Sequence, residues 1–189
     1  MQMSEPRILT INHGGCENIL VSWVSSRLNM GIVQHSNDNG KKAIRIEMLP
    51  ELFSKEWFRD ESSLHRKFSE LEYFPKKDVR MPELKIFPIM DTENESHPDR
   101  CYMTGSMFDG NYFRDRICPI YSIPNLDTVI ERAGLGHVSK DKLTSYSNML
   151  DDLEVQDMYD ALKGRDDTNL YDFLGYCLRT RPWNQNRNL

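Results

Sequence analysis

The first thirty residues have the pattern of a buried strand that turns sharply into a helix. Residues 7–12 (RILTIN) are a short run rich in β-branched apolar side chains, and Gly14 and Gly15 follow it closely. A run of this length that ends at glycines is typical of a buried β-strand. Apolar residues then recur at helical spacing over residues 17–29, which predicts an amphipathic helix. A strand, a glycine turn and a helix form the first unit of an α/β fold.

Strands and helices alternate in this way to about residue 135. Three further strands are predicted, at residues 43–49, 84–90 and 117–121. Pro88 falls inside the third of the four strands, and because proline lacks an N–H it predicts a bulge or an edge strand there. Only helical patterns follow. We therefore expect an α/β domain over residues 1–138, with a mainly parallel sheet of about four strands flanked by helices. A helical C-terminal extension over residues 139–189 is expected to pack on it.

Composition excludes several classes of protein. The 189 residues include eight Phe, eight Tyr and three Trp, which supply enough apolar surface to exclude a disordered chain. The 24 basic and 29 acidic side chains give a net charge of -5, which disfavours a dedicated duplex-binding protein. An enzyme that acts on phosphodiesters remains compatible with this charge, because a metal ion brings positive charge of its own.

The four cysteines and the N-terminus indicate the compartment. The cysteines lie far apart and form no C-x-x-C pair, so they match neither a zinc ribbon nor a disulfide framework. No apolar run follows a basic start, and no stretch approaches the roughly 20 apolar residues that span a bilayer. We expect a cytoplasmic protein with reduced thiols and no membrane partner.

Two of the predicted strands end in turns that carry acids. His13 and Glu17 lie in the turn after the first strand, and Asp91 and Glu93 come directly after residues 84–90. The carboxyl ends of parallel strands meet at one edge of a sheet, where ligands bind. If these two strands are neighbours, Glu17, Asp91 and Glu93 meet in one crevice. Crowded carboxylates repel one another unless a hard cation lies among them, so the spacing predicts a site for Mg²⁺ or Mn²⁺.

Each of these residues also fits a role that needs no metal. Asp91 and Glu93 fit a solvated loop after a strand. A carboxylate such as Glu17 in the first turn of a helix is stabilised by the helix macrodipole. His13 fits a turn or packing residue, and with Cys16 it would form a Cys–His nucleophilic pair, although no Asn or Asp that would orient the histidine is identifiable.

The two acid-bearing turns resemble motifs of the TOPRIM domain, the metal-binding module of primases, topoisomerases and several nucleases linked to bacterial defence. The first motif is HGGCE and the second is DTE after KIFPIM, and the later segments PIYSIPNLDTVIERAGLG and DKLTSYSNML are similar to those of small bacterial members. The resemblance covers residues 6–150. It implies a magnesium-dependent phosphodiester hydrolase that acts on nucleic acid, in bacterial or phage defence. Asp91 and Glu93 would hold the metal, and Glu17 would complete its shell or position water.

One departure from the family bears on activity. His13 stands where the family has its catalytic glutamate. A histidine there would take over proton transfer near neutral pH. The alternative is a catalytically inactive TOPRIM-like fold that works as an interaction or regulatory subunit, with a protein partner or as a homo-oligomer. A small-molecule-binding α/β protein is a third hypothesis.

The polar stretch over residues 91–116 carries three arginines, Arg100, Arg114 and Arg116, interleaved with aromatic residues. Arginines and aromatic rings together bind single-stranded nucleic acid by charge and stacking. A loop held down by its own aromatic side chains has the same composition. We predict that the three arginines contact the phosphates of a nucleic-acid substrate.

Overall fold

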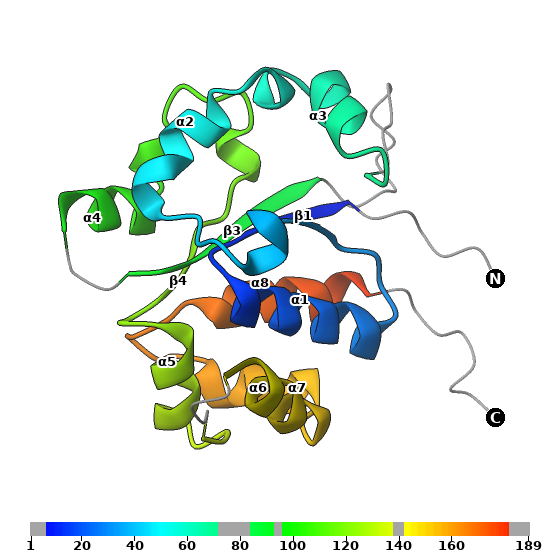
Figure 1. Ribbon diagram of the computed structural model, residues 1–189, viewed down its shortest axis with the longest axis vertical. Helices are drawn as coiled ribbons and strands as arrows, with labels where there is room; N and C mark the ends of the chain where they lie inside the picture. Colours follow the sequence, from blue (N-terminus) through cyan, green and yellow to red (C-terminus); the bar gives the residue numbers. More distant parts are fainter. Residues whose placement is uncertain (1–6, 72–83, 93–95, 138–141, 182–189) are drawn as a thin grey trace.

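The computed structural model describes residues 7–71, 84–92, 96–137 and 142–181, and Figure 1 shows their arrangement. At the centre is a four-stranded sheet in the order β2-β1-β3-β4, in which every neighbouring pair runs parallel. The strands are β1 (Ile8–Asn12), β2 (Val33–His35), β3 (Lys85–Asp91) and β4 (Ile120–Ser122). The predicted fold class, an α/β fold with a parallel sheet of about four strands, is therefore confirmed.

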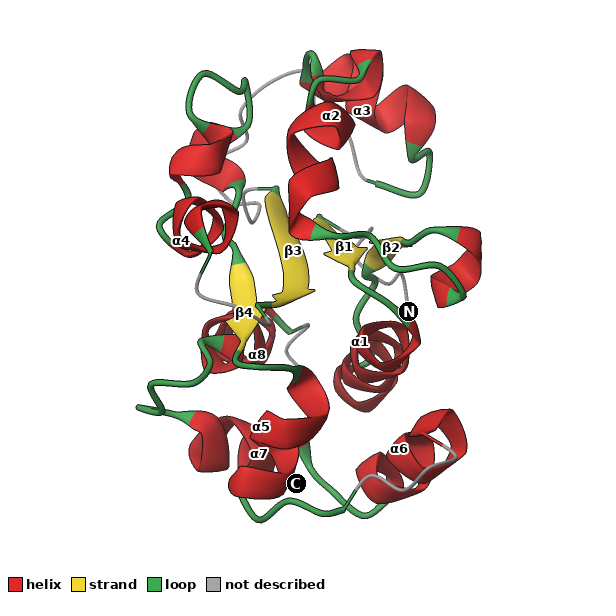
Figure 2. Ribbon diagram, turned by 60° about the vertical axis from the view of Figure 1, so that its left-hand side comes forward, coloured by secondary structure: helices red, strands yellow, loops and turns green. Residues whose placement is uncertain are grey.

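Helices cover both faces of this sheet. The α-helices of the described residues are α1 (Gly15–Leu28), α2 (Leu49–Phe53), α3 (Glu61–Lys67), α4 (His97–Met103), α5 (Leu126–Arg132), α6 (Lys142–Asp151), α7 (Val155–Leu162) and α8 (Leu170–Thr180). Figures 1 and 2 show α2, α3 and α4 on one side of the sheet and the other helices on the opposite side. The helical C-terminal region thus packs on the face that α1 covers, while the predicted boundary at residues 138–139 lies outside the described residues. In the part of the chain that the structure describes, no helix is both long and apolar enough to cross a membrane.

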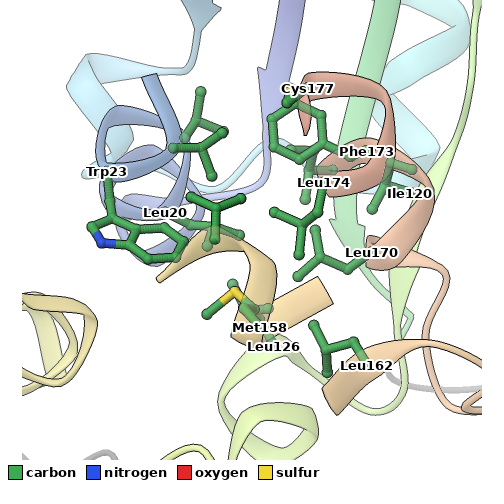
Figure 3. Close-up of a cluster of buried hydrophobic side chains, with 14 of the residues drawn as sticks. Leu20, Trp23, Ile120, Leu126, Met158, Leu162, Leu170, Phe173, Leu174 and Cys177 are labelled. Atoms are coloured by element: carbon green, nitrogen blue, oxygen red, sulfur yellow. The ribbon is translucent and has the colours of Figure 1, made fainter. Parts of the chain in front are cut away.

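Each face of the sheet has its own apolar cluster. On one face, Leu20 of α1 lies in a cluster with Phe173 of α8 (Figure 3). The strand β1 contributes to both clusters, with Ile8 in this one and Leu9 and Ile11 in the cluster on the opposite face. Because both faces of β1 are buried, its sequence is almost continuously apolar rather than alternating.

Residues 43–49, predicted as a strand, do not form one. Ile44 and Ile46 are buried, as the alternation indicates, but Ile46–Met48 is a 3₁₀ turn that leads into α2. The Ile44 N–H donates to the carbonyl of His13 at 2.9 Å, which fixes this segment to the end of β1. Alternation of buried and exposed residues therefore arises here without a strand. The second strand of the sheet is β2, a three-residue edge strand in a segment that is rich in turn residues.

Pro88 lies in a central strand, so the predicted edge strand or bulge is wrong. β3 pairs with β1 on one side and with β4 on the other, and its register with β1 is continuous through the pair Ile11 and Pro88. Tyr102 of α4 adds a side-chain link between β3 and β4 at this position. Its hydroxyl accepts a hydrogen bond from Ile120 N–H at 3.2 Å and donates to the Pro88 carbonyl at 2.7 Å. The hydroxyl thus bridges β3 and β4 where a direct backbone hydrogen bond would otherwise lie.

Tyr102→Phe tests this bridge. The ring is completely buried, so loss of the hydroxyl leaves the Ile120 N–H and the Pro88 carbonyl without their partner in the interior. We expect the free energy of unfolding to fall by about 1–3 kcal/mol, the cost of unsatisfied buried polar groups. Urea unfolding measures the change. Tyr112→Phe is the control, because Tyr112 is 60% exposed, and equal effects of the two variants would contradict the bridging role.

Candidate functional site

The turn from β1 into α1 buries Glu17. This side chain is only 3% exposed, and its Oε2 accepts a hydrogen bond from Gly14 N–H at 2.8 Å. Gly14 is the residue before α1, so the carboxylate closes the first turn of its own helix, as in a capping box. The role at the helix terminus that the sequence indicates for Glu17 is thus present in the structure.

Asp91, the last residue of β3, reaches the start of α5. Its Oδ1 accepts a hydrogen bond from Leu126 N–H at 2.9 Å. The pKa of Asp91 is raised from its ordinary 3.8 to about 7, first by burial and then by the negative charge of Glu17, against the opposing effects of His13 and the Leu126 N–H. Glu17 and Asp91 therefore lie close enough to repel each other. The pairing of β1 with β3 brings these two predicted site residues together.

Two more side chains belong to this acidic site and were not predicted from the sequence. Asp127 in the first turn of α5 also raises the pKa of Asp91. Tyr146 of α6 is completely buried, and its hydroxyl has no hydrogen-bond partner among the described residues. Burial raises the pKa of Tyr146 well above its ordinary value, with further contributions from Glu17 and Asp127. The unpartnered hydroxyl consequently lies within electrostatic reach of the acids.

The packing of α6 against α1 explains how Tyr146 reaches the site. A Cβ added to Gly15 would lie 2.8 Å from the Leu143 side chain, so the start of α6 lies directly on the turn that precedes Glu17. Tyr146 follows Leu143 by one helical turn. The segment containing Tyr146 carries the sequence resemblance, but its residue pattern gives no sign that this ring is completely buried beside two carboxylates.

His13 is held by its backbone beside Asp91. Its N–H donates to the Ile89 carbonyl at 2.9 Å, and its own carbonyl accepts from Ile44 N–H at 2.9 Å. The Nδ1 atom is buried and has no hydrogen-bond partner within the described residues. Because His13 lowers the pKa of Asp91, the imidazole lies near that carboxylate. His13, Glu17 and Asp91 thus form one site, whereas Glu93 lies outside the described residues.

Two of the three predicted phosphate-binding arginines form ion pairs with acids outside this site. Arg114 pairs with Asp109 at 3.0 Å, and Arg116 pairs with Glu61. Ile117 bridges to Ile86 at the start of β3, so the preceding Arg116 lies at the amino edge of the sheet, opposite Asp91.

The third arginine, Arg100, lies on α4. Among the aromatic residues of the same stretch, Tyr102, Phe108 and Phe113 are buried, whereas Tyr112 is 60% exposed. Three of the four rings hold this stretch down, which matches the alternative of a packed loop.

The oxygen atoms at the site suit a hard cation, but the described residues supply few of them. Across residues 7–71, 84–92, 96–137 and 142–181, no group of three or more His, Cys, Asp or Glu side chains is arranged to hold a metal ion. The described carboxylates closest to that role are Glu17 and Asp91. Magnesium commonly takes only one or two protein carboxylates and fills its other positions with water and substrate phosphate.

Comparisons with known proteins identify no relative. No protein-family model, no curated protein and no solved structure matches the chain. The TOPRIM resemblance therefore rests on the two motifs and the two later segments of the sequence, and it stays a prediction.

Asp91→Asn in metal-free buffer tests the buried repulsion. Because the folded-state pKa of Asp91 lies above the unfolded-state value, the stability contributed by the protonated carboxyl is complete below about pH 4 and is lost as pH rises through 7. Asparagine stays neutral and keeps an oxygen for the Leu126 N–H. We expect the variant to gain about 2–4 kcal/mol of unfolding free energy over the wild type between pH 4 and pH 8. Urea unfolding at a series of pH values measures this gain.

Asp109→Asn is the control for this experiment. Its side chain is 69% exposed and pairs with Arg114, so the difference from the wild type should change little over the same pH range. A constant difference between Asp91→Asn and the wild type at all pH values would contradict the buried repulsion.

Proposed function

We propose that the chain is a TOPRIM-like phosphodiester hydrolase that acts on nucleic acid with Mg²⁺ or Mn²⁺. The observation that carries the proposal is that the buried Glu17 and the half-buried Asp91 lie together at the carboxyl ends of two paired parallel strands. Two buried like charges need either a proton or a cation between them. The cytoplasmic location and the role in bacterial or phage defence are part of the same proposal and rest on the sequence alone.

The residues present fit a hard divalent ion. Glu17 and Asp91 offer carboxylate oxygens, and the buried Tyr146 hydroxyl without a described partner adds an oxygen nearby. Of these, Glu17 and Asp91 would hold the ion, with Glu93 as the third ligand that the resemblance implies. When bound, such an ion polarises a phosphoryl oxygen and lowers the pKa of a coordinated water.

The chain's own groups then have separate tasks. His13 lies beside Asp91, and its buried Nδ1, which has no partner in the described part of the chain, is available to take or return a proton. Asp91 is oriented by its hydrogen bond from the Leu126 N–H, and Glu17 by that from Gly14 N–H. These two hydrogen bonds fix the carboxylates before any substrate arrives, which is the preorganisation that catalysis requires.

The second candidate function is a catalytically inactive interaction or regulatory subunit. One observation favours it: both acids already have structural tasks, since Glu17 caps α1 and Asp91 anchors α5. A protonated Asp91 would relieve the repulsion without any metal. With His13 in the place of the family's glutamate, the same geometry would then persist in a protein without activity.

Cleavage assays separate the two functions. Labelled single-stranded and duplex DNA and RNA are incubated with wild type in Mg²⁺, in Mn²⁺ and in EDTA. We expect metal-dependent cleavage that falls by roughly 100-fold or more in Asp91→Ala, because loss of a metal ligand removes several kcal/mol of transition-state stabilisation. Asp109→Ala removes an exposed carboxylate and should leave the rate unchanged. Absence of cleavage with every divalent ion would overturn the hydrolase and favour the inactive subunit.

A further inference from the structure

Lysine and aromatic side chains form a cluster on the segment that follows β2. Trp57 is half-buried, and the ammonium groups of Lys67 and Lys55 lie 4.8 and 5.4 Å from the centroid of its ring. The ring of His35 meets Trp57 edge-on at 5.2 Å, and Phe68 packs against Trp57 at 5.6 Å. We call these five residues the Trp57 patch.

The patch carries positive charge that described acids do not neutralise. Lys55 and Lys67 are exposed, and neither forms an ion pair within the residues that the structure describes. Two acids lie close in sequence, Glu56 and Asp60, but both pair with Arg59, at 3.4 and 3.0 Å. In a chain with a net charge of -5, this positive charge is local.

The pKa of His35 is shifted in the direction that this local positive charge requires. Burial lowers the pKa of His35, and the positive charges of Lys67 and Lys55 lower it further. The imidazole is therefore neutral at pH 7, and the two lysines supply the positive charge of the patch.

One residue of the Trp57 patch, His35, lies at the same edge of the sheet as the acidic site. β1 and β2 run parallel with Ile11 opposite His35, so His35 stands at the carboxyl end of its strand. The next residue, Ser36, accepts a hydrogen bond from the Asn18 side chain at 3.1 Å, and Asn18 directly follows Glu17. This hydrogen bond connects the residue after Glu17 to the residue after His35.

We propose that the Trp57 patch binds a single strand of nucleic acid, with the bases on the indole ring and the phosphates on Lys55 and Lys67. A half-buried indole flanked by two exposed ammonium groups offers both interactions that hold unpaired strands, stacking on an aromatic face and attraction of phosphates. Bases inside a duplex are stacked on each other and cannot use the indole, which favours a single strand over a double one. The proposal rests on the proposed function for nucleic acid as substrate, but its test does not depend on hydrolysis.

Binding is measured in EDTA by the fluorescence anisotropy of a short labelled single-stranded DNA, with the duplex of the same sequence as comparison. The variant Lys55→Gln/Lys67→Gln should bind the single strand more weakly, with the slope of log K against log salt concentration smaller by about 1.4, or 0.7 for each lost phosphate contact. Trp57→Leu should weaken binding roughly 5- to 150-fold, the range measured for loss of base stacking, with little change in this slope.

Lys163→Gln is the matched control. Lys163 also lies over an aromatic ring, 5.6 Å from the centroid of Tyr159, but it follows α7 on the opposite side of the sheet. Its loss should leave affinity and salt slope unchanged. Circular dichroism checks that Trp57→Leu is folded. If Trp57→Leu is not folded, the binding of the Lys55→Gln/Lys67→Gln variant tests the proposal, because exposed lysines tolerate substitution.

Two results would overturn the proposal: wild type that binds the single strand no better than the duplex, or a double lysine variant that binds as well as the wild type. The variant Asp91→Ala distinguishes the binding test of the Trp57 patch from the cleavage test of the proposed hydrolase. It should bind the single strand with wild-type affinity while failing to cleave it. Binding through the patch without cleavage in any metal would refute the hydrolase alone, and cleavage that is insensitive to the patch variants would refute the patch alone.

Discussion

The pairing of β1 with β3 is the constraint on which the rest of the site depends. Because the two strands are parallel neighbours in continuous register, the residues that follow them emerge at one edge of the sheet. The buried Glu17 and the half-buried Asp91 are brought together there, and their repulsion contributes to the raised pKa of Asp91. A buried carboxylate pair is destabilising unless a proton or a cation offsets it. The repulsion between the two carboxylates therefore lowers the free energy of unfolding, and the packing of the rest of the fold offsets this loss.

The same groups that create this cost also position the elements around it. Glu17 caps α1 through the Gly14 N–H, and Asp91 receives the first N–H of α5. On the other side of β3, the Tyr102 hydroxyl joins Pro88 to Ile120 and so holds β4, from which α5 follows. A substitution at Glu17 or Asp91 consequently changes the local structure as well as any catalytic activity. For this reason, the activity assays need to be accompanied by amide variants and by measurements of stability.

The sequence predicted the parts of the fold that local patterns determine. The apolar run of β1, its glycine turn and the period of α1 are local signals, and the acids at the ends of β1 and β3 followed from them. The edge strand β2 has only three residues in a turn-rich segment, and residues 43–49 alternate for reasons of burial alone. The Tyr102 hydroxyl joins Pro88 to Ile120 from a residue fourteen positions later than Pro88, so no local pattern predicts this link. Tyr146 reaches the acids only through the packing of α6 on α1, which no short sequence pattern contains.

We propose that a divalent cation neutralises the carboxylate pair of Glu17 and Asp91. The most direct measurement is an NMR titration of the Asp91 side-chain carboxyl carbon, with and without Mg²⁺. We expect a pKa near 7 in EDTA and a clear fall when Mg²⁺ is added, because a bound cation favours the ionised carboxylate. An ordinary pKa near 4 in EDTA would contradict the buried pair, and a raised pKa that Mg²⁺ leaves unchanged would contradict the metal site.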